Sequence, residues 1–122
     1  MKFRMAALST LSAMALMAAT HTNALAAGSG SFSGMGNYKV SGGVTVTQTG
    51  GKTTVKLASN FKSSSGPDLY IYVGTGSPSK RIAKLKKFTG AQTYTFAGTA
   101  KVTSVHVYCK RYSVGFGTAK LN

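Results

Sequence analysis

The stretch Val44-Thr45-Val46-Thr47-Gln48-Thr49-Gly50-Gly51-Lys52-Thr53-Thr54-Val55-Lys56-Leu57 has the pattern of a β-hairpin. Val44 and Val46 alternate with threonines before the glycine pair, and Val55 and Leu57 alternate with polar residues after it. Strict alternation is typical of a strand with one buried face, and a Gly-Gly pair tolerates the positive φ angles of tight hairpin turns. The sequence therefore predicts two antiparallel strands whose valines and leucine face a core.

Similar short runs, separated by Gly or Pro, fill the remainder of the chain and predict further strands at 69–73, 81–88, 92–96, 104–109 and within 112–121. The run 69–73 is apolar on both faces, which leaves two interpretations: a central strand covered on both sides, or a strand with a tyrosine-lined outer face. The lysines of 81–88 indicate an edge strand. The Gly/Ser-rich segment 28–36 is expected to be a partly loose lead-in.

These patterns predict one fold class. We expect an all-β domain, an antiparallel β-sandwich or flattened barrel of about seven to nine strands, with no helix after the N-terminal region. The sequence length is that of a single domain.

The N-terminal region has the features of a secretory signal. Lys2 and Arg4 precede the uncharged apolar run 5–19, and Ala24-Leu25-Ala26 supplies the small-x-small pattern of a cleavage site. The alternative is a membrane anchor, but the run is shorter than the roughly 20 residues that span a bilayer. We therefore expect a signal peptide over 1–26, a mature domain over 27–122 without a transmembrane segment, and an exported protein, periplasmic or extracellular.

The charge is strongly one-sided. The chain has 15 Lys and Arg residues against one acidic residue, and its formal net charge is +14. A solvated surface accounts for part of this excess, but the dense cluster within 80–87 is a candidate docking surface for an acidic partner; it comprises Lys80, Arg81, Lys84, Lys86 and Lys87. We expect the partner to be a separate acidic redox protein or an anionic envelope polymer, and export makes nucleic acid the weaker choice.

Cys109 is the single cysteine, so it cannot form a disulfide within the chain. Strand alternation puts Val105, Val107 and Cys109 on one face, which favours a small apolar residue that completes a core. The adjacent Lys110 and Arg111 would instead favour a reactive thiolate, whereas burial would favour the protonated thiol. The residues alone leave both interpretations open.

Catalysis and metal binding have little support. His106 lies three residues from Cys109, on the opposite face of the same expected strand, and is expected to be half-exposed. The set of His, Cys and acidic residues after residue 26 is too small for a structural zinc site. Asp68 follows Gly66-Pro67 and is expected to hold that turn or to pair with a lysine. We expect no enzyme active site and no metal or cofactor bound by the chain itself; any haem would belong to a partner.

Several segments resemble one protein family. They are Gly66-Pro67-Asp68-Leu69-Tyr70-Ile71-Tyr72-Val73, the segment 90–96, and the segment 104–121 with Val105-His106-Val107-Tyr108-Cys109. Together with 32–57 they resemble the DM-thirteen domain, the "electron transfer DM" family. The resemblance implies a β-sandwich-like domain in which Cys109 is redox-active. It also implies a link to electron transfer, because relatives adjoin DOMON and cytochrome b-type domains.

Two functions follow as hypotheses. The first is an exported redox or electron-transfer accessory module, with Cys109 as its thiol and the basic cluster as its docking surface. The alternative is a non-catalytic binding or adhesion module, held by positive charge to anionic envelope or matrix polymers, with Cys109 buried in its core.

Overall fold

The computed structural model describes residues 25–122. The predicted signal peptide, 1–26, lies outside this range except for Leu25 and Ala26, which begin the first strand. The described residues contain no helix that is long and apolar enough to cross a membrane.

The described chain forms ten strands and no helix. They are β1 (Leu25–Gly34), β2 (Val40–Ser41), β3 (Gly43–Thr49), β4 (Lys52–Leu57), β5 (Lys62–Ser63), β6 (Leu69–Gly74), β7 (Lys80–Lys84), β8 (Gln92–Ala97), β9 (Ser104–Cys109) and β10 (Val114–Lys120). Eight of them make one sheet in the order β7-β6-β9-β10-β1-β3-β4-β8, and β2 pairs with β5.

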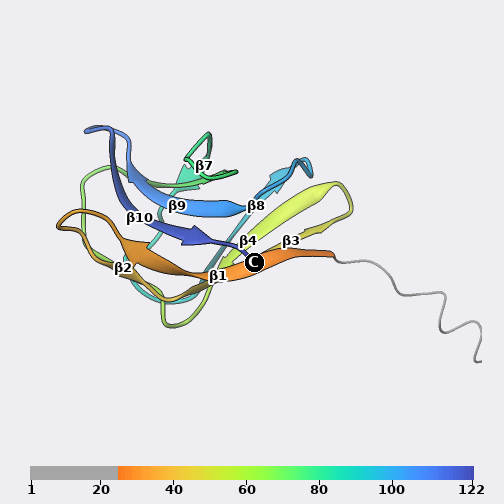
Figure 1. Cartoon of the computed structure of the whole chain (residues 1–122), viewed down its shortest axis with the longest axis horizontal. Coiled ribbons are helices and arrows are strands. Elements are labelled where there is room, and N and C mark those ends of the chain that lie inside the picture. Colours follow the sequence, from red (N-terminus) through yellow and green to blue (C-terminus); the bar gives the residue numbers. More distant parts are fainter. Residues whose placement is uncertain (1–24) are drawn as a thin grey trace, which may run out of the picture.

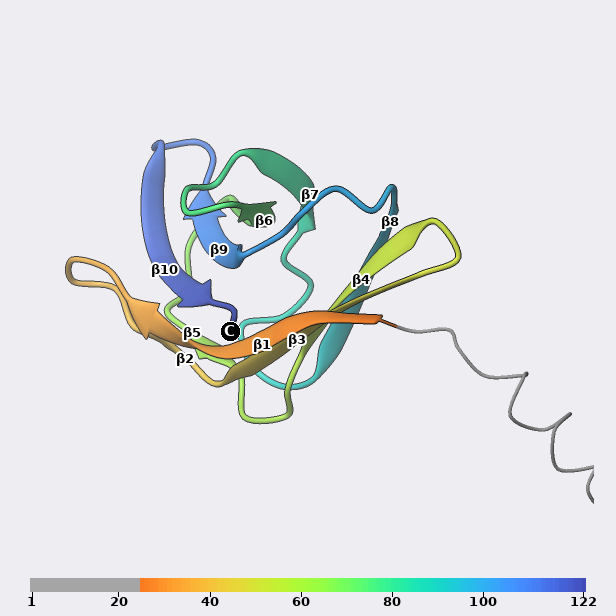
Figure 2. The ribbon, with the colours of Figure 1, turned by 45° about the vertical axis from the view of Figure 1, so that its right-hand side comes forward.

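The eight-stranded sheet curls into a nearly closed, flattened barrel (Figures 1 and 2). Its neighbouring strands are all antiparallel. The edge strands β7 and β8 approach each other, and Tyr94 on β8 helps to join them, because its hydroxyl accepts a hydrogen bond from the Lys86 N–H at 2.9 Å. The predicted fold class is confirmed.

The β3–β4 hairpin forms as the alternation predicts. Val44 pairs with Leu57 and Val46 with Val55, and these four side chains are buried. Gly50 and Gly51 form the two-residue turn with φ angles of 58° and 77°, which L-residues with a side chain adopt at a cost.

The segment 28–36 is not loose, contrary to the prediction. Most of it belongs to β1, which pairs with β3 through residues 25–31 and with β10 through residues 32–34, and so joins the two halves of the sheet. A Cβ atom on Gly30 would lie 2.1 Å from the Lys120 carbonyl oxygen, and one on Gly28 would lie 2.6 Å from that of Asn122. These glycines permit close packing of β1 against the C-terminal end of the chain.

The core lies inside the curled sheet and takes side chains from both halves. Its fully buried members include Val46, Val55, Leu57, Phe61, Ile71, Val105, Val107 and Cys109. On β6, the side chains of Leu69, Ile71 and Val73 point into this core, and Tyr70 and Tyr72 are half-buried on the other face. Of the two interpretations of this strand, the tyrosine-lined outer face is therefore correct.

The basic segment forms an edge strand as predicted, but β7 ends at Lys84 rather than at Phe88. Beyond it, the backbone of Lys86 and Lys87 turns toward β8. There the Lys87 N–H donates to Gln92 Oε1 at 3.2 Å, and Gln92 Nε2 donates to the Lys87 carbonyl at 2.9 Å.

Candidate functional site

The outer face of β7, β6, β9 and β10 aligns side chains in two rows across the sheet. The strand registers place them side by side as Arg81, Tyr72, His106 and Thr118 in one row, and Lys84, Tyr70, Tyr108 and Gly115 in the next. The rings of Tyr72 and Tyr108 contact each other edge to face, with centroids 5.1 Å apart. This face therefore carries aromatic and basic groups at one end and a histidine at the other.

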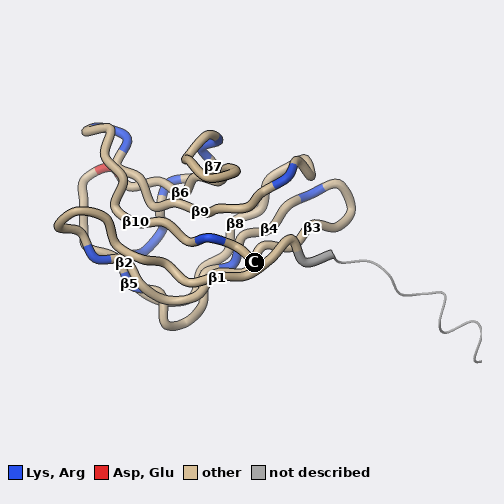
Figure 3. Tube along the Cα trace, in the orientation of Figure 1, with Lys and Arg blue, Asp and Glu red and all other residues tan. Residues whose placement is uncertain are grey.

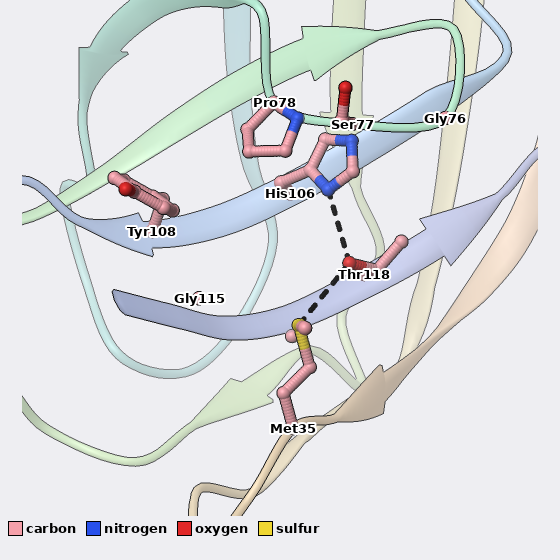
Figure 4. Close-up of a pocket in the computed structure, with 9 residues that line it drawn as sticks. Met35, Gly76, Ser77, Pro78, His106, Tyr108, Gly115 and Thr118 are labelled. Carbon is pink, nitrogen blue, oxygen red and sulfur yellow. Dashed lines mark hydrogen bonds between the residues drawn. The ribbon is translucent and has the colours of Figure 1, made fainter. Parts of the chain in front are cut away.

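His106 is buried, not half-exposed as the sequence indicated; its side chain is only 3% exposed. It does lie on the outer face, as alternation predicts, but the loop between β6 and β7 folds over it with Gly76, Ser77 and Pro78 (Figure 4). Burial disfavours the charged imidazolium and lowers the pKa of His106 below its ordinary value. The ring is therefore neutral at pH 7.

Both ring nitrogens of His106 are hydrogen-bonded to hydroxyl groups. Nε2 lies 2.8 Å from Ser104 Oγ, and Nδ1 lies 3.1 Å from Thr118 Oγ1. Ser104 Oγ also accepts a hydrogen bond from the Gly76 N–H at 3.0 Å, and the Thr118 hydroxyl donates to Met35 Sδ at 3.6 Å. A continuous chain of hydrogen bonds thus runs from the covering loop through Ser104 and the imidazole to a thioether. Figure 4 shows its part from His106 through Thr118 to Met35.

A pocket of about 260 Å³ opens beside this chain of hydrogen bonds. It is lined by Met35, Gly76, Ser77, Pro78, His106, Tyr108, Gly115, Gly117 and Thr118. Sequence reasoning missed the pocket, because Met35 and Thr118 are 83 residues apart and no local pattern links them. The one available signal was the bulge-prone Gly-Phe-Gly of 115–117, where the pairing of β10 with β9 shifts register.

Cys109 lies on the opposite, inner face of β9, in line with Val105 and Val107, and is 0% exposed. Lys110 and Arg111 follow it in an exposed turn. The thiol therefore belongs to the core, and the structure separates it from the pocket by placing the two on opposite faces of the sheet.

The Gly66-Pro67-Asp68 segment lies against the end of β9. The backbone of Lys110 donates to the Asp68 carbonyl at 3.0 Å, and Leu69 pairs with Cys109. The Asp68 carboxylate lies 3.7 Å from Lys84 Nζ, and Lys84 is largely exposed, so this ion pair contributes little stability. Of the two roles expected of Asp68, the structure shows the lysine partner.

The basic cluster of Lys80, Arg81, Lys84, Lys86 and Lys87 is exposed along β7 and the segment after it. Lys80 Nζ lies 5.5 Å from the Phe96 ring centroid, and Lys86 Nζ lies 4.9 Å from that of Tyr94, so both reach across to β8. Arg81 and Lys84 lie over Tyr70, at 5.3 and 5.6 Å. Lys and Arg also occur on other strands and loops (Figure 3), against the one acidic residue of the sequence, Asp68.

These features define a small antiparallel β-barrel domain with a basic, tyrosine-bearing outer face and a buried cysteine. Residues 31–121 match the family model described as Electron transfer DM13, so the chain belongs to that family. The resemblance seen in the sequence is thereby confirmed, and at a coarse level the chain is a domain of an electron-transfer family. No curated protein and no solved structure matches the chain in the other two comparisons.

Proposed function

We propose that this protein is an exported accessory module of electron transfer, not an enzyme, and that its basic cluster docks on a separate acidic redox protein. Membership of the electron transfer DM13 family supports the electron-transfer role. The docking role rests on one observation. Of the five cations in the cluster, Lys84 alone has an ion-pair partner among residues 25–122, so the positive charge of this edge is available to a partner.

The contacts of the cluster support docking in a fixed geometry. Arg81 and Lys84 share the Tyr70 ring, and Lys80 lies over Phe96, so aromatic surfaces constrain three flexible side chains. Cation–π contacts of this kind leave the charged group at the surface while the ring shields one side. An acidic protein surface would meet charges already held in place, and long-range attraction would speed the encounter.

Cys109 enters the proposal as a shielded thiol. At 0% exposure its sulfur cannot attack a partner's disulfide in the closed fold. Cys109 is the last residue of β9, and the turn that follows contains Ser113 with a φ of 51°, a conformation that costs energy for a residue with a side chain. Reaction of the thiol would therefore depend on local opening at this strand end.

The burial of Cys109 also favours a second candidate, the binding module. In that case the thiol only fills the core, and the excess of positive charge holds the protein to anionic envelope or matrix polymers. The two candidates differ in geometry: an acidic redox partner would use the clustered charges, whereas a flexible polymer would respond to positive charge wherever it lies.

The two are separated by charge-reversal variants of equal net charge. We would compare Lys80→Glu/Arg81→Glu with Lys52→Glu/Lys120→Glu, whose positions lie on other strands. The probes are an acidic b-type cytochrome and dextran sulfate, with binding to the immobilised protein measured between about 20 and 150 mM salt. The docking proposal expects the first variant to lose cytochrome binding by about tenfold or more while the second retains it. Equal losses on both probes would favour the binding module and overturn docking.

Alkylation of Cys109 in the native protein tests the thiol. Slow, opening-limited labelling, together with loss of electron transfer to the cytochrome in a Cys109→Ala variant, would support a redox role. Unchanged electron transfer in that variant would remove Cys109 from the mechanism and leave the docking surface as the functional part of the domain.

A further inference from the structure

Two soft-metal donors lie at one point of the outer face. His106 Nδ1 and Met35 Sδ both contact the same atom, Thr118 Oγ1, at 3.1 and 3.6 Å. The donors come from β9 and from the loop after β1, and Figure 4 shows both side chains directed toward the Thr118 hydroxyl between them. For one ion to contact both atoms, the Thr118 hydroxyl must turn away from between them and the flexible methionine must move toward the ring.

The imidazole is prepared for ligation by its surroundings. Burial keeps it neutral, and a metal ligand must be unprotonated at the coordinating nitrogen. Because the Thr118 hydroxyl donates to Met35, Nδ1–H donates to Thr118 Oγ1 and Nε2 accepts from Ser104 Oγ when no ion is bound. An ion at Nδ1 would move the ring proton to Nε2, where Ser104 Oγ, 2.8 Å away, can accept it. Ser104 is itself held by the Gly76 N–H. With an ion bound, Ser104 would be an outer-shell partner of the kind that orients a ligating histidine.

The donor chemistry selects the ion. Thioether sulfur is a soft ligand that favours Cu(I), and imidazole binds copper as well. Among the described residues no group of three His, Cys, Asp or Glu side chains gathers to hold a metal, so ions that require several hard or imidazole donors have no site of that kind. We propose that His106 and Met35 form a binding site for one Cu(I) ion, separate from Cys109 and from the basic cluster.

Space and access agree with this assignment. Met35 is 46% exposed and lines the pocket of about 260 Å³, so an ion can reach its side chain from solvent. Gly115 leaves room for the thioether, because a Cβ atom there would lie 3.0 Å from Met35 Sδ. A bound copper ion would give the domain a redox centre of its own. The copper site goes beyond the proposed docking function, since it uses His106 and Met35 and none of the residues of the basic cluster.

The test is a competition for Cu(I) between the exported protein, as purified under reducing conditions, and the chromogenic chelator bicinchoninate. We expect the unchanged protein to bind one Cu(I) and Met35→Leu to weaken binding by more than the ~10–100-fold that loss of an outer-shell partner costs. Ser104→Ala should weaken it by about tenfold and Gly115→Ala should also weaken it, by displacing the sulfur. Because Met35 is exposed, the Met35→Leu variant should fold normally, which circular dichroism would verify.

Cys109→Ala is the matched control, since a thiol is the other soft donor of residues 25–122. The inference requires that this variant bind Cu(I) as the unchanged protein does. The methyl resonance of Met35, assigned by its loss in Met35→Leu, should shift when Cu(I) is added. Absence of Cu(I) binding, or binding that depends on Cys109 rather than on Met35, would overturn the copper site while leaving the salt-dependent docking test unaffected.

Discussion

His106 and Cys109 lie three residues apart on β9, and their side chains face opposite sides of the sheet. The His106 ring is hydrogen-bonded to Thr118 beneath the β6–β7 loop, whereas Cys109 is enclosed in the core. The strand thus places the imidazole and the thiol on opposite faces of the sheet, so neither group can exchange a proton with the other or share a ligand with it. Their different surroundings lead to different expectations for substitution and for pH.

Cys109→Ser should destabilise the fold. The serine hydroxyl would replace an apolar thiol at a site with 0% exposure, and a buried hydroxyl without a partner costs about 1–3 kcal/mol. Urea denaturation followed by tyrosine fluorescence would measure the free energy of unfolding. Cys109→Ala is the control, since it adds no polar group and should cost less than serine. If serine proved as stable as the unchanged protein, the thiol would have to be near water and the buried placement would be wrong.

Gly51→Ala should also destabilise the fold, for a backbone reason. At φ 77° a residue with a side chain is in the left-handed region, which costs roughly 1–2 kcal/mol, and no atom within 4 Å would clash with the added Cβ. Gly50→Asn provides the contrast, because asparagine tolerates this conformation at the first position of such a turn. Thermal unfolding should therefore rank Gly50→Asn close to the unchanged protein and Gly51→Ala below it. The reverse order would contradict the turn geometry.

Features set by short-range patterns could be predicted from the sequence. The β3–β4 hairpin follows from alternation and from a two-residue glycine turn, which together fix its register. The outward direction of Tyr70 and Tyr72 and the inward direction of Cys109 follow from the same two-residue period. Each of these needs only neighbouring residues and the strand geometry.

Features set by distant segments could not be predicted. Gly28 and Gly30 look like a flexible lead-in until the C-terminal residues Lys120 and Asn122 are placed against them. His106 looks half-exposed until a loop some thirty residues earlier in the chain covers it. The contact of Thr118 with Met35 has the same origin, since it joins residues near opposite ends of the described chain. Local composition carries no information about such tertiary contacts.

Tyr94→Phe should lower stability by removing one buried hydroxyl. That hydroxyl accepts the Lys86 N–H and donates to Gln92 Oε1. Its loss leaves the Lys86 N–H without this acceptor where β7 and β8 meet, whereas Gln92 Oε1 still accepts from the Lys87 N–H. We expect a cost of about 1–3 kcal/mol in urea denaturation. Tyr112→Phe is the matched control, because Tyr112 is 65% exposed, and its unfolding midpoint should be unchanged. Equal effects of the two substitutions would show that the Tyr94 hydroxyl does not join the edge strands.

The stability of the protein should fall as the pH is lowered below about 7, because of His106. In the unfolded chain histidine takes up a proton near pH 6.5, whereas burial lowers the pKa of His106 in the folded chain. Between these two pKa values the unfolded state binds more protons, so the free energy of unfolding decreases as the pH falls. The stability that the neutral His106 ring contributes is therefore fully present above pH 6.5 and is lost as the pH falls through the pKa of the folded state. Urea denaturation from pH 7.5 to 5 would measure this slope. His106→Gln, which does not titrate, should remove most of it and serves as the comparison within the same chain. A slope that survives this substitution would assign the pH dependence to another group and would mean that the imidazole is not held neutral beneath the β6–β7 loop.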